Sequence, residues 1–171
     1  MERAWYDGGM MKSVGAVLLG ILLALGLGML EVFGIVAPIF TRFFGLGLAS
    51  TAVPAVIVVF AAAFAFYFGG MFASYRAPSR RRLHGVMVGV VSFAISPLVN
   101  LGAFAVTANV SDPFANLRTP GALLFTGVLF VVVVAASYVG GRRGEALYAH
   151  NQTYIRRQKR RRAEDRTPER E

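Results

Sequence analysis

The chain has 171 residues, of which 56% are hydrophobic and 16% are charged, and its net charge is +9. A soluble domain carries about 25% charged residues, so this composition excludes an ordinary soluble fold. Long apolar stretches favour a membrane protein instead. Because the sequence contains no cysteine, disulfides, thiolate catalysis and iron–sulfur ligation are excluded.

Four apolar stretches predict an all-α, polytopic membrane protein, a bundle of four transmembrane helices. They cover residues 13–40, 51–75, 84–108 and 121–141. The first is interrupted only by Glu31 and is too long for the apolar region of about 7–15 residues in a cleavable signal peptide. We therefore interpret it as the first span.

The basic residues predict the orientation. Sixteen of the 18 Lys and Arg residues lie before the first span, between spans two and three, or after span four, and only Arg42 and Arg118 lie on the other side. Positive charge accumulates on the cytoplasmic side, so we expect both termini in the cytoplasm and the protein in the plasma (inner) membrane. Residues 1–141 then form the transmembrane domain, and residues 142–171 form a cytoplasmic basic tail.

Rows of small residues, spaced four apart, predict close helix packing, because small side chains let helix backbones approach one another in lipid. We expect the first two spans to form the tightest pair. The rows are Ala16, Gly20, Ala24 and Gly28 in span one, Ala61, Ala65, Gly69 and Ala73 in span two, and a shorter row of Ala136, Gly140 and Gly144 in span four.

An aromatic stripe follows the row in span two, formed by Phe60, Phe64, Phe68 and Phe72. Such a stripe most often faces lipid or fills space between helices. We predict no cofactor, and we keep a pigment- or quinone-binding role as an alternative.

A short repeat closes two of the spans, Tyr67 to Gly70 in span two and Tyr138 to Gly141 in span four. Both segments have the pattern Tyr-x-Gly-Gly and both are expected at the cytoplasmic face. The repeat suggests two parallel helical hairpins, an arrangement that occurs in transporters.

Gly69-Gly70-x-x-Ala73, an Arg-rich loop and Leu83-His84-Gly85 follow one another along the chain. This succession resembles a group of small bacterial four-helix membrane proteins of unassigned activity. The resemblance covers about 25 residues and implies the four-helix architecture alone. The chain departs from it at Ser74-Tyr75, where the group more often has Gly-Arg.

Polar residues within the spans are candidates for an intramembrane site. Glu31 lies 19 residues after Lys12, or roughly 28 Å along a helix, and Asn100 has a similar depth. One interpretation is that Glu31 and Asn100 form a hydrogen bond with each other and line a site or a proton path. The simpler reading is a Glu31 hydrated at the outer rim and an Asn100 that caps a carbonyl freed by Pro97. The candidates are Glu31, Ser92, Ser96 and Asn100.

Catalytic and metal-binding patterns are missing from the sequence. The two histidines, His84 and His150, lie outside the apolar centres of the spans, so they do not form an intramembrane haem site. There is no His-Glu-x-x-His motif. We therefore expect neither an enzyme nor a metal site.

The tail combines apolar and basic residues at helical spacing, which predicts an amphipathic helix on the inner membrane surface. Each basic residue near anionic lipid contributes about 1 kcal/mol. An acidic partner subunit is an alternative, and we do not expect a nucleic-acid partner. The basic run is Arg156, Arg157, Lys159, Arg160, Arg161 and Arg162.

These observations favour a non-enzymatic integral membrane subunit that packs with other membrane proteins or with copies of itself, and that contacts anionic lipid of the inner leaflet through its tail. The alternatives are a small oligomeric transporter or channel protomer, and a pigment- or quinone-binding subunit.

Overall fold

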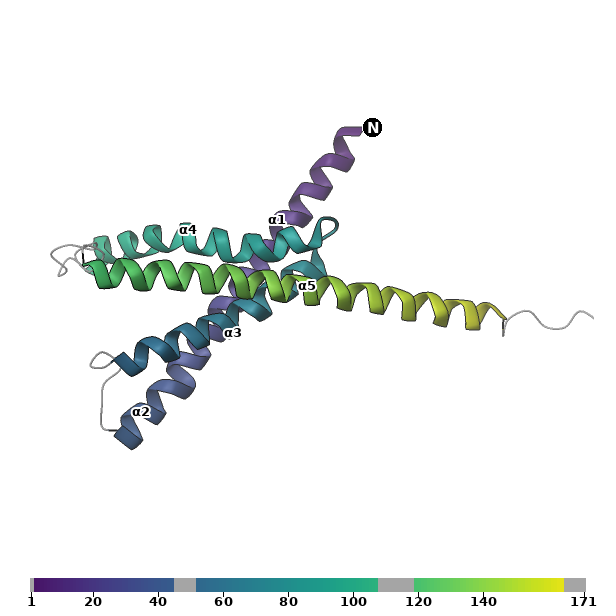
Figure 1. The fold of residues 1–171 in the computed structure, drawn as a ribbon. Helices are drawn as coiled ribbons and strands as arrows, with labels where there is room; N and C mark the ends of the chain where they lie inside the picture. Colours follow the sequence, from purple (N-terminus) through teal and green to yellow (C-terminus); the bar gives the residue numbers. More distant parts are fainter. Residues whose placement is uncertain (1, 45–51, 108–118, 165–171) are drawn as a thin grey trace, which may run out of the picture.

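The computed structural model describes the backbone of most of the chain, and it is helical there apart from the residues at 77–80 and 119. This confirms the all-α prediction for the described part. The backbone is described over residues 2–44, 52–107 and 119–164, and the side chains over 10–31, 33–39, 41–42, 55–96 and 119–162. The elements are α1 (Glu2–Met29), the π-helix η1 (Leu30–Val36), α2 (Ala37–Phe44), α3 (Ala52–Arg76), α4 (Arg81–Thr107) and α5 (Pro120–Glu164) (Figure 1).

Three helical segments are long and apolar enough to cross a membrane: Met10–Ile39, Ala55–Arg76 and Pro120–Arg162. They correspond to the first, second and fourth predicted spans. The third predicted span, residues 84–108 along α4, stays a prediction, as does the orientation of the termini.

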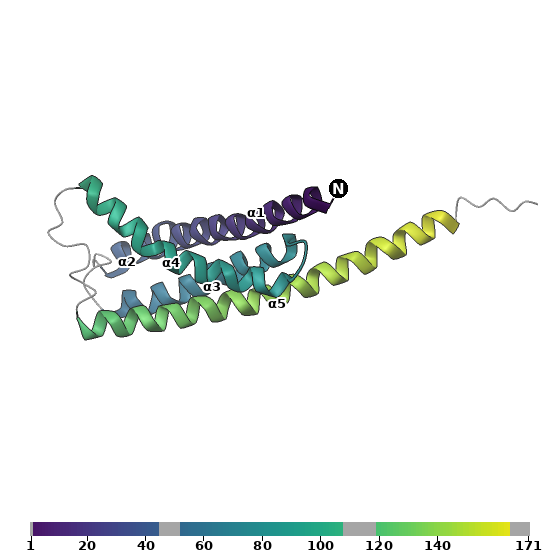
Figure 2. The same ribbon diagram turned by 90° about the horizontal axis from the view of Figure 1, so that it is seen from above.

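The hairpin of α3 and α4 forms the centre of the structure. α1 packs on one side of this hairpin and α5 on the other, and the described residues of α1 and α5 share no contact. The N-terminus, the α3–α4 turn and the C-terminal half of α5 point to the same end of the molecule (Figures 1 and 2). Towards the opposite end, α2 and α3 diverge from α4 and α5 (Figure 1), and α4 diverges from α5 (Figure 2).

The small-residue rows of α1 and α3 face each other where the two helices cross. A Cβ added to Gly20 would lie 2.7 Å from the carbonyl oxygen of Gly69, and one added to Gly69 would lie 2.8 Å from the Cβ of Ala24. Ala65 is 1% exposed. Helix backbones come this close only where the facing residues have small side chains or none. Both rows are therefore buried inside the chain and are not available to a partner.

The contact between α3 and α5 is more extensive than that between α1 and α3, so the expectation that the first two spans form the tightest pair was wrong. Gly140 and Gly144 place the α5 backbone directly against the backbone of Tyr67 and Met71. Ser74 adds a buried hydrogen bond of 2.8 Å from its hydroxyl to the Gly141 carbonyl. The two Tyr-x-Gly-Gly segments therefore pack on each other. The hairpin repeat stays a prediction, since the α3–α4 contact has no counterpart between the described residues of α1 and α5.

The turn between α3 and α4 is shorter than the predicted loop at 76–83. α3 ends before Pro78, which cannot continue a helix hydrogen-bond ladder, and α4 begins at Arg81 rather than at His84. Arg80 has a φ of 41°, a left-handed conformation that reverses the chain. The Arg81 guanidinium donates a 2.6 Å hydrogen bond to the Ala77 carbonyl and holds the turn closed.

α5 is one uninterrupted helix of 45 residues. The sequence predicts a span at 121–141 and a separate helix in the tail, and the structure differs because no helix break separates them. The helix begins after Thr119, whose hydroxyl accepts a hydrogen bond from the Ala122 amide, as an N-cap does. Between Arg142 and Glu164 there is no proline, and Arg, Glu, Ala, Leu, Gln and Lys favour helix.

Candidate functional site

Glu31 is the only acidic residue between positions 8 and 111, and it lies in the first turn of η1. Pro38, seven residues later, lacks the amide hydrogen that would bond to the Gly34 carbonyl, and its ring crowds that carbonyl. A wider π turn before the proline relieves this crowding. Single π turns inside α-helices occur frequently at functional sites, so the backbone around Glu31 is itself unusual.

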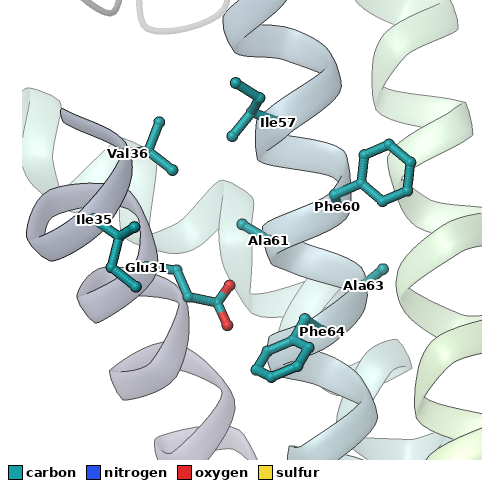
Figure 3. A pocket seen from close by; sticks show the side chains of 8 residues that line it. All are labelled: Glu31, Ile35, Val36, Ile57, Phe60, Ala61, Ala63 and Phe64. Atoms are coloured by element: carbon teal, nitrogen blue, oxygen red, sulfur yellow. The ribbon is translucent and has the colours of Figure 1, made fainter. Parts of the chain in front are cut away.

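The Glu31 side chain points from η1 towards α3, into a cavity of about 510 Å³ (Figure 3). All other lining side chains are apolar, and they come from η1 and from α3. The lining residues are Glu31, Ile35, Val36, Ile57, Phe60, Ala61, Ala63 and Phe64. We call this cavity the Glu31 cleft.

Neither carboxylate oxygen of Glu31 has a hydrogen-bond partner among the described residues, and both oxygens are shielded from solvent. A charged carboxylate without a partner in apolar surroundings is costly. In a membrane span such a residue is a functional candidate by default. Among the described residues the carboxylate thus has no positive counterpart, which a proton or a cation would supply.

Two rings of the predicted aromatic stripe border the cleft. Phe60 is 71% exposed and Phe64 is 54% exposed, so this part of the stripe is not covered by the described residues of the chain. Phe64 also contacts the ring of Phe68, with the centroids 4.7 Å apart. At the other end of the stripe, the Arg76 guanidinium lies 5.7 Å from the Phe72 ring centroid.

Of the other predicted polar residues, Ser92 and Ser96 do not line the cleft. Ser92 lies on α4 with a buried hydroxyl that has no partner in the described part of the chain, and Ser96 is exposed. Asn100 lies within α4, but its side chain, like that of Pro97, falls outside the described residues. Glu31 is thus brought together with the Phe stripe, and its hydrogen bond to Asn100 stays a prediction.

A second group of interacting side chains lies where α5 leaves the bundle. The Arg81 guanidinium stacks 3.3 Å above the Tyr148 ring, and Tyr148 meets Tyr75 edge to face with centroids 6.0 Å apart. The Tyr75 hydroxyl accepts a 2.9 Å hydrogen bond from Asn151. These contacts tie α5 to the α3–α4 turn, and we call them the exit cluster.

Arg82 and Glu145 form an ion pair beside the exit cluster. The hydrogen bond to the Glu145 carboxylate, and its negative charge, raise the pKa of the Arg82 guanidinium above its ordinary value. Neither the pair nor the stacking of Arg81 was predicted from the sequence. A signal was present in the spacing, since Glu145 and Tyr148 are three apart and share a helix face.

The basic run after the exit cluster is exposed along its whole length from Arg156 to Arg162. Both views show this part of α5 extending beyond every other helix (Figures 1 and 2). It does not fold back onto the bundle. Its predicted partners, anionic lipid or an acidic protein, stay predictions.

The fold and the sites together place this chain among the helical membrane proteins. No known protein family, curated protein sequence or solved structure matches it. Within the described residues, no group of three or more His, Asp or Glu side chains is placed to hold a metal ion. The features of the molecule that bear on function are the Glu31 cleft, the exit cluster and the basic run.

Proposed function

We propose that the protein is a non-enzymatic integral membrane subunit with four spans, both termini in the cytoplasm, and a rigid basic helix that it presents to an acidic partner. The distribution of Lys and Arg supports the orientation. The packing of α4 against α1, α3 and α5 supports a fourth span, because a segment enclosed by three membrane helices shares their environment.

The continuity of α5 is the observation that carries this proposal. From Arg143 to Arg156 there are 13 residues, or roughly 20 Å of helix, and Arg162 lies roughly 28 Å from Arg143. At physiological ionic strength, charges are screened over about 8 Å. With α5 along the membrane normal, Arg156 thus lies more than two screening lengths beyond Arg143, which disfavours strong lipid contact of the run from Arg156 to Arg162.

The exit cluster explains why the helix keeps its direction. The Arg81 stack, the hydrogen bond between Asn151 and Tyr75, and the Arg82–Glu145 pair all act within the two turns where α5 leaves the bundle. Basic residues closer to the membrane, Arg142 and Arg143, are in a position to contact anionic headgroups. Lipid contact and partner contact then belong to different parts of α5.

The surfaces available for packing with other membrane proteins differ from the small-residue rows that the sequence suggests. Because the α1 and α3 rows are buried against each other, a partner meets the large side chains that remain exposed. On α5 these include Leu123, Leu124 and Val131, along a groove of about 520 Å³.

The test is the size of the complex extracted from native membranes in mild detergent. We expect a complex well above the 18.5 kDa of the chain. A triple variant, Arg156→Gln, Arg157→Gln and Lys159→Gln, should lose the partner, whereas the double variant Arg142→Gln and Arg143→Gln should keep it. A monomeric wild type would refute the subunit, and a triple variant that keeps the complex would refute the acidic partner.

The position of the basic run can be tested separately. Since the chain has no cysteine, an environment-sensitive fluorophore on Gln158→Cys labels one site. We expect the same water-like emission in vesicles with and without anionic lipid, and a lipid-dependent shift for the same label on Arg143→Cys. A lipid-dependent blue shift at position 158 would show that the tail lies on the membrane, as the sequence predicts.

A small oligomeric transporter is the second candidate, and the Glu31 cleft is the observation that favours it. An acidic group within a span is typical of ion and substrate paths. Flux of a cationic solute into proteoliposomes no higher than into empty liposomes would argue against transport.

A further inference from the structure

We propose that the Glu31 cleft binds an organic cation, a positively charged group on a bulky apolar or aromatic body, which enters from the lipid. This goes beyond the role of a membrane subunit and does not depend on it.

The charge of the ligand follows from the carboxylate. The Glu31 side chain reaches from η1 towards α3 at the wall of the cleft (Figure 3), and no described side chain donates to its buried oxygens. The remaining lining is apolar. An empty cleft is therefore stable only with a proton on Glu31, whereas a bound cation neutralises the carboxylate directly.

The apolar or aromatic body of the ligand is inferred from the volume of the cleft and from the residues that line it. A cavity of about 510 Å³ lies within the range of about 300–1,000 Å³ that is usual for small-molecule sites. Phe60 and Phe64 border it on the α3 side, and aromatic faces attract cations whose charge is shielded by carbon. A small hydrated ion would leave most of this apolar surface unfilled.

The route by which the ligand enters is inferred from the depth of Glu31 in the membrane and from the exposure of the Phe side chains beside it. Lys12 and Arg42 lie near the two ends of the apolar segment Met10–Ile39, and Glu31 lies 19 residues from the first and 11 from the second. Glu31 thus lies roughly two thirds of the way across the hydrocarbon layer. Because Phe60 and Phe64 are more than half exposed at this level, the cleft opens sideways towards the acyl chains.

The groove on α5 provides an internal comparison. It has nearly the same volume, about 520 Å³, and contains no charged residue. Its lining is Leu123, Leu124, Gly127, Val128, Val131 and Val132. A ligand attracted by shape and apolar surface alone would use both sites equally, whereas an organic cation distinguishes them by the carboxylate.

The experiment uses the full chain in lipid nanodiscs and two probes of the same shape and opposite charge, tetraphenylphosphonium and tetraphenylborate. We expect tetraphenylphosphonium to bind above the level of empty nanodiscs and tetraphenylborate not to do so. Glu31→Gln, which keeps the side-chain volume, should weaken tetraphenylphosphonium binding more than tenfold. Phe64→Leu should weaken it about two- to fivefold, the range expected for loss of one cation–π contact.

Phe33→Leu is the matched control, because Phe33 lies on η1, is exposed and does not line the cleft. This variant should bind tetraphenylphosphonium as tightly as the wild type does. The proposal is overturned if wild type binds no more than empty nanodiscs, if tetraphenylborate binds as well, or if Glu31→Gln binds like wild type. Should Glu31→Gln fail to fold, equal binding by Phe64→Leu and Phe33→Leu would overturn it instead.

Discussion

Replacing Gly140 by alanine tests whether close backbone contact between α3 and α5 holds the structure together. The new Cβ would overlap the Tyr67 carbonyl oxygen and would lie 2.8 Å from the Tyr67 carbonyl carbon and 3.0 Å from the Met71 amide nitrogen. Ordinary contact begins at 3.4 Å, and both neighbours are backbone atoms that no rotamer change can move. The two helices must therefore separate by about an ångström or more along this line.

The expected magnitude combines two opposing effects. Overpacking of this kind costs about 1–3 kcal/mol, and the change from glycine to alanine in a helix stabilises by about 0.5–1 kcal/mol. The net loss for Gly140→Ala is thus about 0–2.5 kcal/mol, and the overlap with the Tyr67 carbonyl oxygen favours the upper part of this range. Gly127→Ala, on the same helix, is the matched control because its Cβ would meet nothing within 4 Å. It should show the stabilising effect alone, since it changes helix propensity without changing packing.

The assay is equilibrium unfolding in mixed micelles with increasing dodecyl sulfate, followed by circular dichroism. Gly140→Ala should unfold at a lower denaturant fraction than wild type, and Gly127→Ala at an equal or higher one. If both variants unfold together, the α3–α5 contact does not depend on the absence of a side chain at position 140, and the packing argument fails.

Two further predictions concern the cytoplasmic end of the molecule. Arg82→Ala should shift the thermal midpoint by less than about 2 °C, since exposed ion pairs contribute little; a large loss would show that the pair with Glu145 is structural. Spin labels on Tyr138→Cys and Gln158→Cys, 20 residues apart, should give one narrow distance near 30 Å for a continuous helix, and a broad or shorter distribution would contradict it.

The helical class and most of the membrane segments follow from the sequence because hydropathy measures a local property. A stretch such as 51–75 is apolar whatever it packs against, and α3 at Ala52–Arg76 matches it to within one residue at each end. Four-residue spacing of small side chains is equally local. The facing of the Gly20 and Gly69 rows could therefore be anticipated from the sequence.

The end of α5 could not be located in the same way. Hydropathy falls at Gly141 because the chain leaves the apolar stretch, and this change marks a change of surroundings rather than a break in the helix. Backbone hydrogen bonds continue through Arg142, since no residue there interrupts them. The tightest pair was missed for a related reason. A row of four small residues looks stronger than a row of three, but Gly140 and Gly144 approach the α3 backbone more closely than Gly20 does.

The depth of Glu31 shows how a local count and a tertiary arrangement can disagree. Counting 1.5 Å per residue from Lys12 puts the carboxylate roughly 28 Å away, at the outer rim of a layer about 30 Å thick. That count assumes a helix along the membrane normal. The segment Met10–Ile39 has 30 residues, roughly 45 Å, and α1 runs obliquely across α5 in Figure 1. A tilted helix brings Glu31 back into the hydrocarbon layer, beside Phe64 rather than beside water. In these surroundings a carboxylate that has no partner among the described residues requires a proton or a cation.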